Sequence, residues 1–298
     1  MEIAVASGKG GTGKTFLASN LTIFLERELG GAVAVDADVE APDLAIALGG
    51  VDEVLSRREV WESAKASIDY EKCTGCLKCY DACMFDAIVV EEAKPRIIEE
   101  YCEGCGACRL VCPVKAIEIR EALTGYLSVI KTVGGIYAVM GDLEVGGRNT
   151  GHIVYMVREE ARKLAEKLGK RFIVIDSAPG IGCPVVSSLS GADILIVVVE
   201  PIPQSLQGAR RVLEVAEAFR LRSYLVLNKY DLNEEFSKRI PEELGLEVLG
   251  RIPYDEEVVE SYTMMNPILL SNPGGRVGKA LKEVFENLIE LGGLSRHG

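Results

Sequence analysis

A glycine-rich stretch near the amino terminus constrains the fold of this 298-residue chain more than any other feature. Residues 8–15 read G-K-G-G-T-G-K-T and stand between a short apolar run and a helix-like segment. The pattern G-x-x-x-x-G-K-[ST] between a strand and a helix is the signature of a phosphate-binding P-loop. The sequence therefore predicts an α/β fold, a P-loop NTPase whose mainly parallel sheet is covered by helices on both faces.

Each residue type in the loop has a physical role in nucleotide binding. Glycines let several backbone N–H groups point inward, where the positive end of the following helix dipole also lies. Lys14 is expected to reach the β- and γ-phosphates, and the Thr15 hydroxyl to coordinate Mg²⁺. The residues expected to bind nucleotide through this loop are Gly8, Lys9, Gly10, Gly11, Thr12, Gly13, Lys14 and Thr15.

A second lysine, Lys9, follows the first glycine of the motif. With it, the stretch resembles the K-G-G-x-G-K-[ST] signature of the deviant Walker A ATPases, the family of MinD, ParA and the nitrogenase iron protein. The resemblance implies ATP/ADP and Mg²⁺ as cofactors, ATP hydrolysis, and a homodimer that forms with ATP. It further implies that Lys9 crosses the dimer interface to the partner's nucleotide, so that Lys9 and Lys14 are both catalytic. A solvated loop lysine is the alternative for Lys9.

Two acidic segments extend the resemblance. An apolar strand ends in Asp36-Ala37-Asp38, and the resemblance makes Asp38 the catalytic residue that orients the attacking water near the Mg²⁺ shell. Asp36 is expected to support the P-loop. The sequence D-S-A-P-G at 176–180 resembles the family's Walker B and switch II segments, which implies that Asp176 holds the Mg²⁺ shell and that the Gly180 N–H senses the γ-phosphate.

Two later positions are assigned by resemblance alone. Asn228 follows the apolar run 225–227, and the family position implies that it recognises adenine. Pro253 lies in a segment whose backbone is expected to border the base.

Eight of the nine cysteines form two runs with the same spacing, C-x2-C-x2-C-x3-C. The second run ends in the C-P pair of bacterial ferredoxins, whereas Met84 follows the first. In two-cluster ferredoxins, the fourth cysteine of each run ligates the other cluster. The pattern therefore predicts Cys73, Cys76, Cys79 and Cys112 around one [4Fe–4S] cluster, and Cys102, Cys105, Cys108 and Cys83 around the other.

The cysteine repeat predicts an inserted two-cluster ferredoxin domain at residues 69–121, between the two parts of an ATPase domain at 1–68 and 122–298. Structural zinc also uses four cysteines and is the alternative, although three close cysteines and a fourth from the other repeat fit a cube better. So short an insert buries little apolar surface, so ligation should supply most of its folding free energy. Residues 51–69, polar and mixed in charge, are expected to be a linker.

The ninth cysteine, Cys183, lies seven residues after Asp176. The nitrogenase iron protein has a ligand of its shared cluster at this distance, but its second cysteine has no counterpart in residues 141–151 of this chain. We therefore expect Cys183 to be a small buried thiol.

Composition excludes several partners. A formal net charge of −12 argues against broad nucleic-acid binding and against an anionic membrane surface. No apolar run reaches the roughly 18–20 residues of a membrane span, and a strand at the amino terminus leaves no room for a signal peptide. The acidic segment 277–291 is expected to be a packed terminal helix. These features favour the cytoplasm.

The sequence thus predicts an ATP-binding, ATP-hydrolysing iron–sulfur protein in which nucleotide state controls electron transfer through two clusters. A carrier that delivers clusters to apo-proteins is the first alternative, and a spatial-positioning ATPase with a structural insert is the second. Neither a redox partner nor a client protein is identified by the residues.

Overall fold

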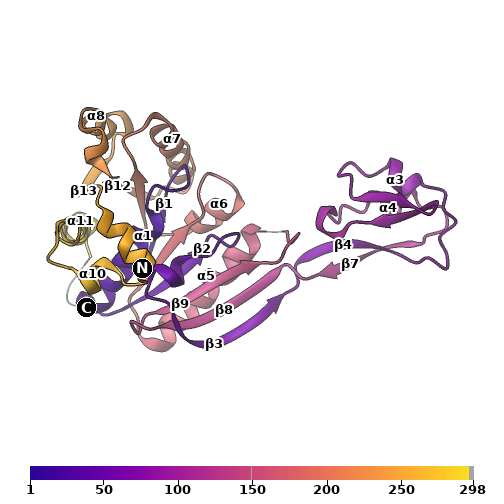
Figure 1. Ribbon diagram of the computed structural model, residues 1–298, viewed down its shortest axis with the longest axis horizontal. Coiled ribbons are helices and arrows are strands. Elements are labelled where there is room, and N and C mark those ends of the chain that lie inside the picture. Colours follow the sequence, from indigo (N-terminus) through magenta and orange to yellow (C-terminus); the bar gives the residue numbers. More distant parts are fainter. Residues whose placement is uncertain (149, 295–298) are drawn as a thin grey trace.

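The structure, a computed structural model, describes residues 1–148 and 150–294. An α/β body contains the amino terminus and the last helix, and a narrow two-stranded arm connects it to a smaller unit (Figure 1). None of the helices in the described residues is long and apolar enough to cross a membrane.

A nine-stranded sheet forms the centre of the body. Its strands are β1 (Glu2–Ala6), β2 (Ala32–Ala37), β3 (Val51–Val60), β8 (Gly125–Thr132), β9 (Tyr137–Leu143), β10 (Phe172–Ser177), β11 (Ile194–Val199), β12 (Arg222–Asn228) and β13 (Glu247–Ile252). Their spatial order is β13-β12-β11-β1-β10-β2-β9-β8-β3. Within the described residues, six of the eight pairings are parallel, while β8 pairs antiparallel with both β9 and β3.

Helices cover both faces of this sheet. The helices on one face are α1 (Lys14–Glu28), α2 (Leu44–Ala47), α9 (Glu256–Thr263), α10 (Ile268–Ser271) and α11 (Arg276–Gly292). Those on the other face are α5 (Thr150–Leu168), α6 (Cys183–Leu189), α7 (Pro203–Ala218) and α8 (Glu234–Leu244). Because side chains alternate along a strand, Ile3 and Val5 of β1 enter the first core and Ala4 and Ala6 enter the second. The predicted P-loop NTPase architecture and the packed terminal helix are confirmed.

The smaller unit contains two short antiparallel ribbons and two short helices. Strand β4 (Ser63–Ile68) pairs with β7 (Ile117–Ala122), and β5 (Ile88–Glu91) pairs with β6 (Lys94–Ile97). The helices are α3 (Lys78–Asp81) and α4 (Ala107–Val111). Its hydrophobic cluster is small and includes Cys79, Cys102 and Cys108 beside a few aliphatic side chains.

The predicted linker at 51–69 is wrong, because these residues form β3 and β4. Strand β3 lies at the edge of the large sheet, and nine of its ten residues are exposed. An exposed edge strand needs no apolar face, so its sequence lacks the alternation that identifies a half-buried strand. Backbone pairing with β8 forms this strand instead.

Candidate nucleotide and metal-cluster sites

The P-loop has the geometry that its sequence predicts. The backbone leaves β1 after Ala6 and enters α1 at Lys14, which is buried. Gly11 and Gly13 have φ angles of +77° and +93°, a region that favours glycine. Helix α1 therefore begins directly at the loop and directs its free N–H groups toward the space beside it.

A cavity of about 480 Å³ lies beside this loop, within the size range of small-molecule sites. Of the predicted nucleotide-binding residues, those lining it are Gly10, Gly11, Gly13, Lys14, Thr15, Asp38, Asn228 and Pro253. The structure thus brings together residues from the first and last thirds of the chain.

Gly8 belongs to the packing behind the loop. A Cβ atom built on Gly8 would lie 2.0 Å from the backbone carbon of Gly208 in α7. Thr12 is fully buried, and its Oγ1 has no hydrogen-bond partner in the part of the chain that the structure describes. Gly8 and Thr12 therefore shape the loop, and neither is among the residues that line the cavity.

Lys9 is held by an acidic side chain of its own chain. Its Nζ lies 3.0 Å from a carboxylate oxygen of Glu200, and the other oxygen accepts a hydrogen bond of 2.5 Å from Lys229 Nζ. Lys229 Nζ also donates to the backbone oxygen of Gly11 at 3.1 Å. Burial raises the pKa of Glu200, but the hydrogen bonds from Lys229 and Lys9 outweigh it and hold that pKa below its ordinary value.

A buried carboxylate lies beneath the P-loop where the Mg²⁺ shell is expected. Asp176 is 1% exposed, and its Oδ1 is among the few buried side-chain oxygens in the described residues without a hydrogen-bond partner. Burial raises its pKa to about 7, against the lowering effects of the Thr15 hydroxyl and Lys14. An orphaned carboxylate oxygen near a threonine hydroxyl suits Mg²⁺, which takes one or two protein oxygens and completes its shell with phosphate and water.

The segments after β2 and β10 are held by backbone hydrogen bonds. Asp36 accepts from the N–H groups of Leu44 (2.9 Å) and Asp38 (3.1 Å), so it braces the turn after β2. Support of the P-loop by Asp36 stays a prediction. The Gly180 N–H donates to the Ser7 oxygen at 3.1 Å, with a φ of +91°. This bond has to break before the same N–H can reach a γ-phosphate.

Asn228 braces the P-loop from the end of β12. Its Nδ2 donates to the Thr12 oxygen at 2.7 Å, and its Oδ1 accepts from the Lys229 N–H at 3.0 Å. A Cβ on Gly13 would lie 2.2 Å from Nδ2, so glycine is required there for this contact. Adenine recognition by Asn228 stays a prediction.

The sequence reasoning missed one wall of the cavity. Helix α9 contributes Val258, Val259 and Tyr262, and Asp43, after β2, also lines the cavity. The spacing of apolar residues in 256–263 is that of an amphipathic helix, but nothing local indicates which cavity such a helix covers.

The eight cysteines of the repeat line two separate cavities in the smaller unit. Cys73, Cys76, Cys79 and Cys112 line one, together with apolar side chains of β4, β6 and β7. Cys83, Cys102, Cys105 and Cys108 line the other. Each cavity thus gathers the four cysteines that the repeat assigns to one cluster, including the fourth cysteine from the other run.

Backbone N–H groups reach a cysteine sulfur in each of these two cavities. The Ala66 N–H donates to Cys102 Sγ at 3.4 Å, and the Ala116 N–H to Cys112 Sγ at 3.2 Å, contacts that stabilise thiolate sulfur. In the described residues, no three His, Cys, Asp or Glu side chains converge closely enough to hold one metal ion.

Burial opposes ionisation of the unligated thiols. It raises the pKa of both Cys79 and Cys108, so neither forms a thiolate readily without a metal. Cys183 behaves differently, because it lies exposed at the start of α6. The expectation of a buried thiol at Cys183 is wrong.

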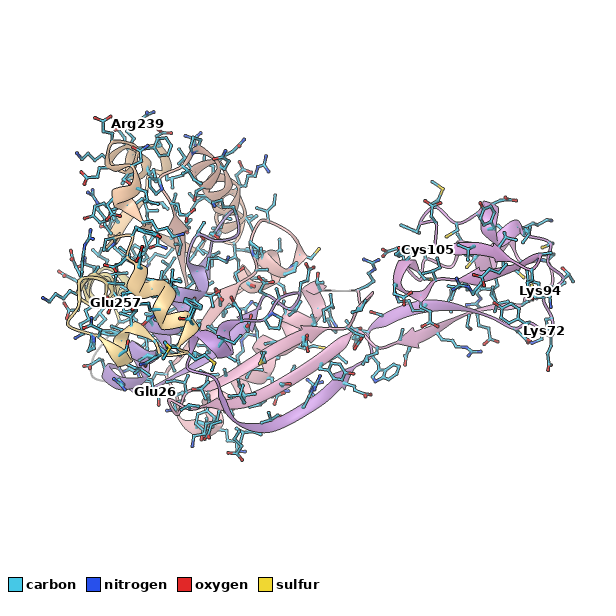
Figure 2. The ribbon with its side chains drawn as sticks, in the orientation of Figure 1. Glu26, Lys72, Lys94, Cys105, Arg239 and Glu257 are labelled. Atoms are coloured by element: carbon cyan, nitrogen blue, oxygen red, sulfur yellow. The ribbon has the colours of Figure 1, made fainter. Side chains whose placement is uncertain are left out.

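The two cysteine-lined cavities lie at different distances from the body. Figure 2 shows Cys105 on the side of the smaller unit nearest the body, and Lys72 and Lys94 at the far end. The cavity that contains Cys105 is therefore proximal, and the one that begins at Cys73, next to Lys72, is distal. Strand β1 and helix α1, which flank the P-loop, lie in the body, away from the smaller unit (Figure 1).

Comparison with known proteins decides the family of the body. The sequence profile of the CobQ/CobB/MinD/ParA nucleotide binding domain matches residues 3–268. The chain belongs to this family. An uncharacterized protein of Methanocaldococcus jannaschii is 32% identical over 294 residues, which is 98% of this chain and 97% of that protein. An uncharacterized ATP-binding protein of the same organism is 29% identical over 296 residues, 98% of each chain.

A solved member of the family shares the fold. The septum site-determining protein MinD of Pyrococcus horikoshii, complexed with Mg-ADP, superposes with a TM-score of 0.61 at 19% identity, covering 98% of this chain and 97% of that one. The predicted relationship to MinD and ParA is thus confirmed, and nucleotide binding accords with the family description. That description does not mention the cysteine repeat.

Proposed function

We propose that this protein is an ATP-hydrolysing switch that carries two [4Fe–4S] clusters, and that its nucleotide state controls electron transfer to a partner protein. The observation that carries the proposal is the sorting of eight cysteines into two cavities of four, each completed by the opposite run. This is the ligand arrangement of a two-cluster ferredoxin. Residues 69–121 are then the inserted domain, and 1–68 and 122–298 the ATPase.

The ATPase role follows from the charges around the nucleotide cavity. Lys14 neutralises the β- and γ-phosphates, Thr15 and Asp176 hold Mg²⁺, and Asp38 orients the attacking water. Asp38 lines the cavity. Burial raises its pKa above the ordinary value, although the positive charge of Lys14 partly opposes this. Lys9 acts on the nucleotide of a second copy in the ATP-bound homodimer, which requires it to leave Glu200.

The cysteine sites supply the redox part of the proposal. A [4Fe–4S] cluster exchanges one electron at a potential set by its charge, its hydrogen bonds and its exposure. The chain contributes four sulfurs per site, apolar walls that exclude water, and N–H donors to Cys102 and Cys112. Movement of groups near either site would therefore change its potential.

Anaerobic purification with iron and acid-labile sulfide analysis tests the proposal directly. We expect about eight iron atoms per chain, and about four in each of Cys76→Ala and Cys105→Ala, with the electron paramagnetic resonance (EPR) signals of reduced [4Fe–4S] clusters. Zinc in place of iron would overturn the cluster assignment. Identical midpoint potentials with ATP, ADP and no nucleotide would overturn the coupling.

A spatial-positioning ATPase is the second candidate, favoured by the resemblance of the body to MinD. It predicts that a variant with all eight repeat cysteines changed to serine keeps ATP-dependent dimerisation and function in cells. A cluster carrier makes a different prediction: iron moves from this protein to an apo-ferredoxin within minutes and the transfer depends on ATP. Clusters that stay bound under these conditions, with a nucleotide-dependent potential, favour electron transfer over both.

A further inference from the structure

One buried lysine contacts both the proximal cysteine site and the body. Lys65, on β4, is 9% exposed, and its Nζ donates to the backbone oxygens of Cys102 (2.9 Å) and Gly146 (2.6 Å). Cys102 lines the proximal cavity, whereas Gly146 lies between β9 and α5 in the body. One ammonium group therefore joins a cluster-site backbone to a loop of the ATPase.

The same loop makes further contacts with the segment around Cys102. Arg148 pairs with Glu103 at 2.8 Å and donates to the Glu100 oxygen at 3.4 Å. A Cβ on Gly146 would lie 2.7 Å from the Glu100 Cα, so the two backbones are closely packed. Among the described residues, no hydrogen bond or ion pair joins the segment 69–98, which holds three ligands of the distal site, to the body.

Helix α5, which follows Arg148 closely in the chain, contacts α6, the helix that follows the switch II segment 176–180. Residue Thr150 begins α5, and the oxygen of the next residue, Gly151, accepts a hydrogen bond of 2.7 Å from Ser187 Oγ on α6. A Cβ on Gly151 would approach Cys183 Cβ to 3.1 Å. Buried Arg158 of α5 donates to the Ser187 and Ser190 oxygens at the end of α6.

These contacts make α5 and α6 a tightly connected pair. Helix α6 begins three residues after Gly180, whose N–H has to leave Ser7 before it can meet a γ-phosphate. If switch II is displaced, these contacts give it a path to α6 and to the start of α5.

We propose that Lys65 is a positioning residue that couples switch II to the proximal cluster, so that the potential of this cluster responds to nucleotide and that of the distal cluster does not. The inference rests on the proposed function. A positive charge near a cluster favours its reduced form, so moving Lys65 changes the potential. Contact alone is a spatial argument, so the test has to measure coupling.

The test is an EPR-monitored redox titration of the holoprotein with ADP and with ATPγS. Lys65→Met removes the charge and keeps the volume. Lys72→Met is the matched control, because Lys72 pairs with Asp69 at 2.7 Å beside the distal ligand Cys73. The variants Cys76→Ala and Cys105→Ala assign each potential to one site.

We expect the reduced-to-oxidised ratio of the proximal cluster to change about tenfold between the two nucleotides, a shift of about 59 mV. Lys65→Met should abolish this shift, and Lys72→Met should leave it. Hydrogen exchange at residues 100–104 should differ between nucleotides in the wild type and not in Lys65→Met. Arg148→Gln, a milder change, should reduce the shift and is measured in parallel in case Lys65→Met does not fold.

The outcomes separate the two proposals. A wild-type shift that persists in Lys65→Met and Arg148→Gln, or that belongs to the distal cluster, overturns the role of Lys65 and leaves the proposed function intact. A wild type without any nucleotide-dependent shift overturns the proposed coupling itself.

Discussion

Glu200→Gln should strengthen the ATP-dependent dimer. In the structure the Glu200 carboxylate holds Lys9 at 3.0 Å, with side-chain exposures of 9% and 31%. If Lys9 serves the partner's nucleotide, each protomer must break this ion pair when the dimer forms. Glutamine keeps the size of the side chain and removes the charge that retains Lys9.

The size of the effect follows from the exposure of the pair. Two unit charges at this separation attract by about 5–6 kcal/mol at an effective dielectric constant of 20. Because Lys9 is about one-third exposed, solvent screening reduces the net value to about 1 kcal/mol. Two protomers then contribute about 2 kcal/mol, so the dimer of Glu200→Gln should be about 30-fold tighter.

Sedimentation velocity with Mg–ATPγS over a range of protein concentrations measures this dissociation constant. Glu243→Gln is the matched control, since Glu243 also binds two cations, Arg210 at 2.8 Å and Arg239 at 3.0 Å, outside the nucleotide cavity. The control dimer should be unchanged. An equal or weaker dimer in Glu200→Gln refutes the reasoning, as does a large loss of nucleotide affinity, which would mean that Glu200 acts mainly through Lys229.

Three further predictions concern stability. Gly8→Ala should lower the free energy of unfolding by about 1–3 kcal/mol in thermal melts without nucleotide, because its Cβ meets backbone, whereas Gly10→Ala, with open space around it, should not. Burial raises the pKa of Glu2, but hydrogen bonds from Arg162 and Arg158 outweigh it and lower that pKa below 4.5. The stability that Glu2 contributes is therefore present above pH 4.5 and lost as pH falls through the lowered pKa. Glu2→Gln should lower the free energy of unfolding by about 3–5 kcal/mol at pH 7. A difference in unfolding free energy from the wild type that persists in thermal melts at acid pH would contradict this. Removal of iron should accelerate hydrogen exchange in 69–121 and leave the body protected, because the small cluster of apolar residues there cannot stabilise it alone; slow exchange in the apo-protein would disprove this.

Local chemistry explains which parts the sequence could predict. The P-loop was predictable because a tight turn, a helix start and a phosphate site impose their residues within one stretch, as Gly13 and Lys14 show. The grouping of the eight cysteines into two sets of four was also predictable, since their spacing along the chain determines which of them can lie together. Strand β3 was not, because its pairing with β8 depends on backbone and not on side-chain pattern.

Contacts between distant segments account for the remaining differences. Tyr262 and Asp43 face one cavity from positions more than 200 residues apart, and Glu200 meets Lys9 across a similar distance along the chain. Lys65 was placed in a linker, although it is buried between Cys102 and Gly146. Such contacts are created by the topology of the sheet and the arm, and no local pattern encodes them.

The separation between the nucleotide cavity and the cysteine sites leaves two routes for coupling, and Lys9 distinguishes them. One route passes through the contacts of the loop with Lys65 and operates within a single chain. The other requires dimerisation, which would change what surrounds the smaller unit. Lys9→Ala should abolish the proposed dimer but leave Lys14, Thr15 and Gly180 in place to bind ATPγS. If the proximal potential of this monomeric variant still shifts with ATPγS, the route through Lys65 is sufficient; if the shift disappears with the dimer, the contacts of Lys65 hold the arm in place and carry no signal.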